Sequence, residues 1–145
     1  MVKTKTDIRL ATRKDRLAIK AVNEASLPVG YDEKNWEQMI AEKCSFVAVQ
    51  SGLVIGYIIC NNTGCVVTFA VLEQHRSKGI GKQLMIKCMD HMRKLKYERL
   101  ILRVQLSNVK AQKFYQSLGF IQKEHLANYY GNNEDAYLLE ATLIQ

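Results

Sequence analysis

The chain has 145 residues, 48% of them hydrophobic, which is close to the usual size of one domain and enough for a sizeable core. Its net charge of +7 suits a ribosome, a membrane surface or a phosphorylated cofactor, but no Lys/Arg run has the length of a nucleic-acid arm. No run approaches about 18 apolar residues and the start lacks an apolar core, so we expect neither a membrane span nor a signal peptide.

The cysteines predict a reducing environment. Cys44, Cys60, Cys65 and Cys88 show neither a C-x-x-C spacing nor histidine partners at zinc-site distances. Three of them lie in or beside apolar runs, so we expect reduced thiols in the core and no metal site. Because such thiols are typical of intracellular proteins, the sequence predicts a cytoplasmic location.

The first half of the chain predicts a strand, two helices and an antiparallel meander. Thr12 can cap the first helix with Asp15 in a partial capping box, and Leu17, Ile19 or Ala18, and Val22 are expected on its buried stripe. The two-residue turn at 51–52 suits a hairpin. The predicted elements are a strand at 8–10, helices at 12–25 and 32–42, and strands at 45–50, 53–61 and 65–71.

The second half alternates helices and strands. Asn108 can cap its second helix and Gly119 can end it. The expected elements are a helix at 82–96, a strand at 99–104, a helix at 109–118, and strands at 120–126 and 135–143. The buried stripe of the first of these helices is expected to hold Leu84, Met85, Cys88, Met92 and Leu95. This order predicts a mixed α+β sheet rather than a doubly wound one.

A basic, glycine-containing turn at 76–81 joins a strand to a helix. Gly79 and Gly81 let the backbone approach a ligand, and the free N–H groups of the helix start favour an anion. Arg76, Lys78 and Lys82 add positive charge, so a phosphate or pyrophosphate fits, although a plain helix start is the alternative. The G-x-G-x-x-G fingerprint and the P-loop ending are absent, which disfavours a dinucleotide fold and a triphosphatase.

Two motifs together resemble the GCN5-related N-acetyltransferase (GNAT) superfamily. Residues 71–84, VLEQHRSKGIGKQL, are similar to its pyrophosphate loop, and Asn108-x-x-Ala111-x-x-Phe114-Tyr115-x-x-x-Gly119-Phe120 is similar to its second cofactor motif. The resemblance implies one N-acetyltransferase domain over 1–145, with a mixed, mostly antiparallel sheet of six to seven strands. That sheet would be splayed in the middle and flanked by about four helices. Acetyl-CoA would be the cosubstrate, and no metal would be needed.

The resemblance also implies roles for particular residues. Main-chain groups near Val71 would pair with the pantetheine arm, which Asn108 would also meet. Tyr115 would place its hydroxyl near the thioester sulfur as the acid. The implied cofactor-binding residues are Val71, Arg76, Ser77, Lys78, Gly79, Ile80, Gly81, Lys82, Asn108 and Tyr115.

Within the superfamily, segments 27–31, 104–108 and 128–136 look like the protein N-terminal acetyltransferases, nearest to the NatE-type catalytic subunit. The implied substrate is the N-terminus of a protein or peptide. Tyr129 and Tyr130 would close its pocket and bond the peptide backbone. The apolar lining would come from Leu27, Pro28, Val29 and Tyr31. An ordinary loop and a pair of half-buried hairpin aromatics are the alternatives.

The chain departs from that subgroup at both positions of the catalytic base, which hold Cys65 and Arg103. Arginine stays protonated at any working pH, so it is not a base. Water could carry the proton instead, or His75, His125 or Glu24 could serve as the base. A fixed cation at Arg103 could also pair with an acidic substrate residue, whereas a solvent-facing arginine is the plain alternative.

Other functions remain open from the sequence. The chain could acetylate a small amine or a lysine. It could also be a weakly active acetyl-CoA-binding module that docks to a ribosome or an acetyltransferase complex through its basic face. A nucleic-acid binder is disfavoured, because the basic residues lack interleaved aromatic residues.

Overall fold

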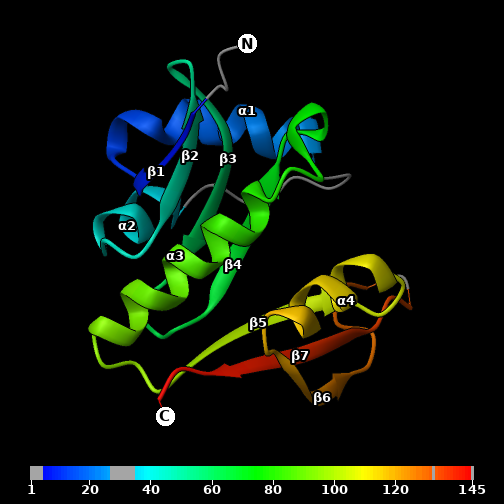
Figure 1. Cartoon of the computed structure of the whole chain (residues 1–145). Helices are drawn as coiled ribbons and strands as arrows, with labels where there is room; N and C mark the ends of the chain where they lie inside the picture. Colours follow the sequence, from blue (N-terminus) through cyan, green and yellow to red (C-terminus); the bar gives the residue numbers. More distant parts are fainter. Residues whose placement is uncertain (1–4, 27–34, 132, 145) are drawn as a thin grey trace.

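The computed structural model describes residues 5–26, 35–131 and 133–144 (Figure 1). Its elements follow the predicted order. They are β1 (Thr6–Leu10), the 3-10 turn η1 (Arg13–Asp15), α1 (Arg16–Ser26), α2 (Trp36–Ala41), β2 (Phe46–Gln50), β3 (Leu53–Cys60), β4 (Val66–Val71), the 3-10 turn η3 (Glu73–His75), α3 (Ile80–Lys94), β5 (Arg99–Gln105), α4 (Val109–Ser117), β6 (Ile121–Leu126) and β7 (Ala136–Thr142).

The strands form two sheets that meet at one point. Strands β1-β2-β3-β4 make an antiparallel sheet, and β5-β7-β6 make a second one. A single parallel bridge between Cys65 and Ile101 joins them, and the Ile101 N–H donates to the Gly64 carbonyl at 2.8 Å. Beyond this bridge β4 and β5 diverge (Figure 1). The predicted mixed, mostly antiparallel fold that splays in the middle is therefore confirmed.

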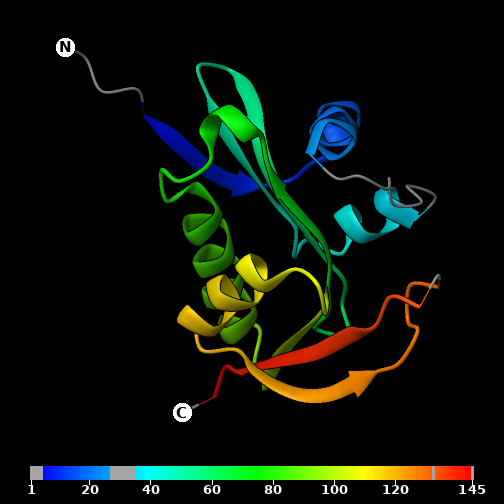
Figure 2. The ribbon, with the colours of Figure 1, turned by 90° about the vertical axis from the view of Figure 1, so that its right-hand side faces the viewer.

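Helices cover both faces of the first sheet. Figure 2 shows α3 and α4 on one side, and α1 and α2 on the other. The α3 side chains join one core with Leu100, Leu102 and Val104 of β5, which ties the two sheets together. The other core holds Ile19 and Val22 of α1 and Trp36 and Ile40 of α2, packed on β2 and β3. Deep burial of these apolar residues supplies the main stabilisation of the fold.

Two residues expected on buried stripes are exposed. Leu17 is 69% exposed, because a helix that buries Ile19, Val22 and Asn23 turns the position two residues before Ile19 toward solvent. Leu95 is 50% exposed, because α3 ends at Lys94 and Leu95 is already its C-terminal cap. Both predictions were wrong.

The cysteines are buried and free, as predicted. In the described ranges, no group of three or more His, Cys, Asp or Glu side chains could hold a metal ion. Within those same ranges, no helix combines the length and the apolar character that a membrane span requires.

Candidate active site

The outer edge of β4 presents main-chain groups to the gap between β4 and β5. Leu72 N–H donates to the Ile55 carbonyl at 2.9 Å, and Gly56 lies opposite Val71. Because bonded and non-bonded pairs alternate in an antiparallel ladder, the N–H and C=O groups of Phe69 and Val71 point away from β3. An extended ligand can therefore pair with this edge as an added strand.

The two segments predicted to bind the cofactor flank the open end of this gap. Strands β4 and β5 run in parallel from the Cys65–Ile101 bridge, so their C-terminal ends lie on the same side. The glycine turn follows β4, and Asn108 follows β5. The fold thus brings together two segments that are well separated in sequence.

Gly79 and Gly81 in the glycine turn are needed for different reasons. Gly79 is the N-cap of α3 and has φ +81°, a conformation that favours glycine, and Ser77 also has a positive φ of 63°. A Cβ on Gly81 would lie 3.3 Å from Cζ of Phe69, so that glycine permits close packing of α3 on β4. The N–H groups of the first turn of α3 have no partner within the helix, and no acidic residue lies there.

The charged residues of the turn differ in orientation. Nε of Arg76 donates to the Val71 carbonyl at 2.8 Å, so this side chain folds back on the end of β4. That contact occupies the Val71 carbonyl and leaves the Val71 N–H and the Phe69 main chain facing the gap. Lys78 and Lys82 are exposed and form no ion pair with another described residue. An anion at the start of α3 would therefore meet unpaired lysines.

Helix α4 is defined by its caps, both as predicted. Oδ1 of Asn108 accepts from the Ala111 N–H at 3.1 Å. At the other end the Phe120 N–H donates to the Tyr115 carbonyl at 3.1 Å, and Gly119 has φ +97°, which is a Schellman motif. Since the Asn108 oxygen serves the cap, its NH₂ group is the part left for a ligand.

Tyr115 extends from α4 toward β4. Its ring lies 6.5 Å from Phe69 and 5.7 Å from Phe120, and the Phe69 ring is also 6.0 Å from Phe114. Phe69, which the sequence patterns did not single out, is thus the residue on which Gly81, Phe114 and Tyr115 converge. Its place on β4 is visible in the sequence, but its partners are not.

Cys65 and Arg103, the two positions where the sequence resemblance implies a catalytic base, meet where β4 and β5 join, at the closed end of the gap. Nη1 of Arg103 lies 3.6 Å from Sγ of Cys65, and the Arg103 guanidinium stands 5.5 Å from the ring centre of Tyr129. Burial raises the pKa of the Cys65 thiol, and the neighbouring Arg103 only partly offsets this effect. Neither side chain can accept a proton near neutral pH, so the contact holds no general base.

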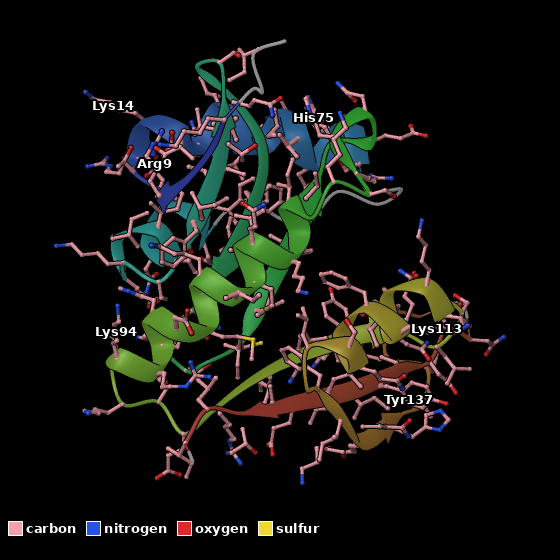
Figure 3. All side chains as sticks on the ribbon, viewed as in Figure 1. Arg9, Lys14, His75, Lys94, Lys113 and Tyr137 are labelled. Atoms are coloured by element: carbon pink, nitrogen blue, oxygen red, sulfur yellow. The ribbon has the colours of Figure 1, made fainter. Side chains whose placement is uncertain are left out.

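The other base candidates lie elsewhere. His75 belongs to η3, which follows the end of β4 remote from Cys65, and Figure 3 shows it far from Tyr137. Nε2 of His125 is 2.7 Å from a carboxylate oxygen of Asp135, and its ring packs on Tyr137. Hydrogen bonds lower the pKa of Asp135; the bond from the Asn128 N–H has the larger effect and the bond from His125 the smaller one. Glu24 is exposed on α1.

The residues predicted to bind the substrate lie only partly within the described ranges. The rings of Tyr129 and Tyr130 lie 5.0 Å apart, nearly perpendicular, and Tyr129 is 49% exposed. Both follow β6 in the turn toward β7, and Tyr129 lies beside Arg103. The predicted apolar lining lies outside the described residues; it comprises Leu27, Pro28, Val29 and Tyr31.

A buried polar triad anchors the end of α1. Nδ2 of Asn23 donates to the Tyr57 hydroxyl at 2.6 Å, and that hydroxyl is 2.7 Å from the Thr68 hydroxyl. The triad ties α1 to β3 and β4 just before segment 27–34. Sequence reasoning missed it, although an asparagine four residues after Ile19, on the apolar face of a helix, is a signal of such a contact.

Comparisons with known proteins agree with this geometry. The model of the acetyltransferase (GNAT) family matches residues 12–120. An N-alpha-acetyltransferase of Sulfurisphaera tokodaii is 34% identical over 154 aligned residues, covering 94% of this chain and 92% of that protein. Both matches extend over most of the chain and not only over the short motifs.

Two solved structures share the whole fold. Ard1 from Thermoplasma volcanium has a TM-score of 0.89 and 25% identity, and the match covers 97% of this chain and 99% of that one. Arabidopsis thaliana Naa50, in complex with the bisubstrate analogue CoA-Ac-MVNAL, has a TM-score of 0.82 and 27% identity over 93% and 97% of the two chains. The chain therefore belongs to the acetyltransferase (GNAT) family, and it is an acetyl-CoA-dependent N-acetyltransferase.

Proposed function

We propose that this chain, as a single domain over residues 1–145, transfers the acetyl group of acetyl-CoA to the N-terminal α-amine of a protein or peptide. The observation that carries the proposal is the gap between β4 and β5. It has free main-chain groups along β4, a basic glycine turn at its mouth and the ring of Tyr129 beside its closed end. The relatives named N-alpha-acetyltransferase and the Naa50 complex support the choice of an N-terminal amine.

The cofactor half of the site follows from the mouth of the gap. The N–H groups of Ser77 to Lys82 and the ammonium groups of Lys78 and Lys82 would receive the pyrophosphate. The N–H of Val71 and the main chain of Phe69 would pair with the pantetheine arm. The guanidinium of Arg76 would keep its bond to the Val71 carbonyl and shape the end of β4.

The acid role belongs to Tyr115. Its ring is held by Phe69 and Phe120, so its hydroxyl can be presented to the gap at a defined place. A hydrogen bond from that hydroxyl would stabilise the departing thiolate. The NH₂ group of Asn108 would help to orient the pantetheine arm.

The amine loses its proton without a dedicated base. An α-amine has a pKa of about 8, so a useful fraction is neutral near pH 7. Cys65 and Arg103 cannot take the proton, and water in the open gap would carry it away. Tyr129 and Tyr130 would bond the peptide backbone, and Leu27, Pro28, Val29 and Tyr31 would receive its first side chains.

A second function is supported by the same contact between Cys65 and Arg103. A member of this family without its base pair could bind acetyl-CoA with little turnover and dock to a ribosome or a larger acetyltransferase subunit. The net charge of +7 favours docking to an acidic partner. Free buried thiols fit a cytoplasmic setting for either function.

Two measurements separate these functions. Acetyl-CoA at saturation should raise the melting temperature, whereas ATP at the same concentration should not, because only a specific ligand stabilises the folded state. Mass spectrometry should then find acetyl groups on peptide α-amines, and none on matched peptides with a blocked N-terminus and a free lysine. Stabilisation without acetylation of any amine favours the docking module, and preferential acetylation of polyamines or lysine contradicts the N-terminal assignment.

A further inference from the structure

Arg103 is a cation placed at the closed end of the gap. It lies on β5 between Leu102 and Val104, whose side chains are buried in the α3 core, so the Arg103 side chain points to the opposite face. It is exposed there, beside Cys65 and over the ring of Tyr129. It forms no ion pair with any carboxylate of the described residues.

The carboxylate nearest in register is engaged elsewhere. Glu140 lies opposite Ile101, so Arg99 and Arg103 are both its diagonal neighbours. It pairs with Arg99 at 3.5 Å and with Lys123 at 3.7 Å. Glu140 therefore already forms ion pairs with two cations, and it forms none with Arg103.

The acidic groups near the hairpin are also occupied or distant. Asp135 bonds His125 at 2.7 Å, and Glu134 accepts from the Ser107 hydroxyl at 2.8 Å. Glu124 lies on β6, with β7 between it and β5, which amounts to about 10 Å at the usual strand spacing. Within the described part of the chain, the charge of Arg103 is thus uncompensated.

Its two contacts hold the guanidinium without neutralising it. The Cys65 thiol stays protonated near neutral pH, because burial raises its pKa. The ring of Tyr129 attracts the cation through its π face, so the N–H donors other than the one that Nη1 gives to the Cys65 sulfur stay available for an anion. A guanidinium that is fixed in position presents its N–H donors in one plane, which is the geometry that binds the two oxygens of a carboxylate.

We propose that Arg103 is a specificity-determining residue, which selects peptides that carry an aspartate or glutamate side chain at one of their first two positions. The inference rests on the proposed function, since the peptide must enter between the Tyr129–Tyr130 hairpin and the closed end of the gap. The substrate carboxylate supplies the anion that the described residues do not provide. A lysine at the same position is repelled by the fixed charge.

The test uses peptides that differ only in charge. Matched pairs carry Glu or Gln, and Asp or Asn, at residue one or two, and kcat/KM is measured by mass spectrometry at pH 7. The wild type should prefer the acidic member of one pair about tenfold, as expected for a hydrogen bond to a charged group. Arg103→Gln should reduce this preference to about twofold or less, and Arg103→Glu should shift it to the Lys peptide.

A matched control removes one positive charge elsewhere. Lys94, at the far end of α3 from the glycine turn, is exposed, and Figure 3 shows it far from Tyr137, the residue of β7 that pairs with Val104 beside Arg103. Lys94→Gln should keep the acidic preference of the wild type. If Lys94→Gln weakens the preference as much as Arg103→Gln does, net charge rather than Arg103 sets it, and the proposal is overturned.

Three further outcomes decide the matter. Equal kcat/KM for the Glu and Gln peptides contradicts the proposal, as does an Arg103→Gln variant that slows every peptide by the same factor.

Binding of the same peptides to the CoA-loaded protein is measured by calorimetry and needs no turnover. If no peptide is acetylated, the proposed function fails, while tighter binding of the Glu peptide still supports the carboxylate site and equal binding removes it.

Discussion

Nη1 of Arg103 lies 3.6 Å from Sγ of Cys65, and this contact spans the two sheets at the point where they join. Arg103 lies on β5 and Cys65 directly precedes β4, and the backbones of these two strands pair at the Cys65–Ile101 bridge. One of them is a buried thiol with a raised pKa, and the other is a permanent cation. The closed end of the gap is therefore electrostatically positive and has no proton acceptor from these two side chains.

The pH dependence of acetyl transfer should follow the substrate rather than the enzyme. We expect kcat/KM for an N-terminal peptide to rise about tenfold per pH unit and to level off near the α-amine pKa of about 8. Kinetics between pH 5.5 and 9 check this. A plateau that begins well below pH 8 would instead show that a group of the enzyme, and not the free amine, controls the reaction.

Replacing Arg103 by histidine should restore a base at this position. We expect Arg103→His to raise kcat for a neutral peptide at pH 7 about tenfold, toward the lower end of the usual gain from general base catalysis. Arg103→Gln is the control, because it removes the same cation without adding a base. Equal rates for the two variants would contradict a role for proton transfer at position 103.

Tyr115→Phe tests the acid. The ring contacts with Phe69, Phe114 and Phe120 remain in this variant, so the melting temperature should change by only a few degrees. Loss of the hydroxyl should lower kcat about 100-fold, while the KM for acetyl-CoA changes little. Steady-state kinetics at saturating peptide measure both values, and an unchanged kcat would exclude Tyr115 as the proton donor.

Asn108 separates a capping role from a cofactor role. Asn108→Ala should cost about 1 kcal/mol of unfolding free energy, because the Ala111 N–H loses its acceptor. Asn108→Asp keeps that acceptor but lacks the NH₂ group, so its stability should match the wild type. If the NH₂ group orients the pantetheine arm, both variants raise the KM for acetyl-CoA; a normal KM in Asn108→Asp leaves only the cap.

Asp15 should make stability depend on acid pH. Its carboxylate accepts from Arg9 at 2.8 and 2.9 Å and from the Thr12 N–H at 2.7 Å, and the Arg9 bonds above all lower its pKa. The folded state therefore favours the ionised form, so the stabilisation is present above the unfolded-state pKa of about 3.9 and is lost as pH falls through the lower folded-state pKa.

The variant Asp15→Asn removes this charge and keeps the side-chain shape. We expect it to lose about 1–3 kcal/mol of unfolding free energy at pH 7, the usual value for hydrogen bonds to a charged group. Urea denaturation at pH 7 and at pH 3 checks the sign, since the difference from the wild type should shrink at pH 3. A constant difference at both pH values would point to a packing effect instead.

Local patterns were sufficient for most of the fold. Ser51 and Gly52 have φ of 51° and 78°, the pair of positive values that a two-residue hairpin needs, and the turn was predicted from these residue types. The Thr12–Asp15 box and the caps at Asn108 and Gly119 were likewise predicted, because a cap depends on residues within a few positions. Errors occurred where a stripe was extended past the end of a helix, as at Leu95, or placed on the wrong face, as at Leu17.

The glycine turn, the Asn108 motif and the family itself were determined by the sequence alone, because each depends on residue types at short, fixed spacings. The tertiary structure decided which groups meet across long separations. Arg76 turns back to the Val71 carbonyl, Gly81 makes room for Phe69, and Arg103 reaches Cys65 and Tyr129 with no carboxylate partner among the described residues. Such contacts depend on register and on the divergence of two sheets, which set distances that no local pattern contains.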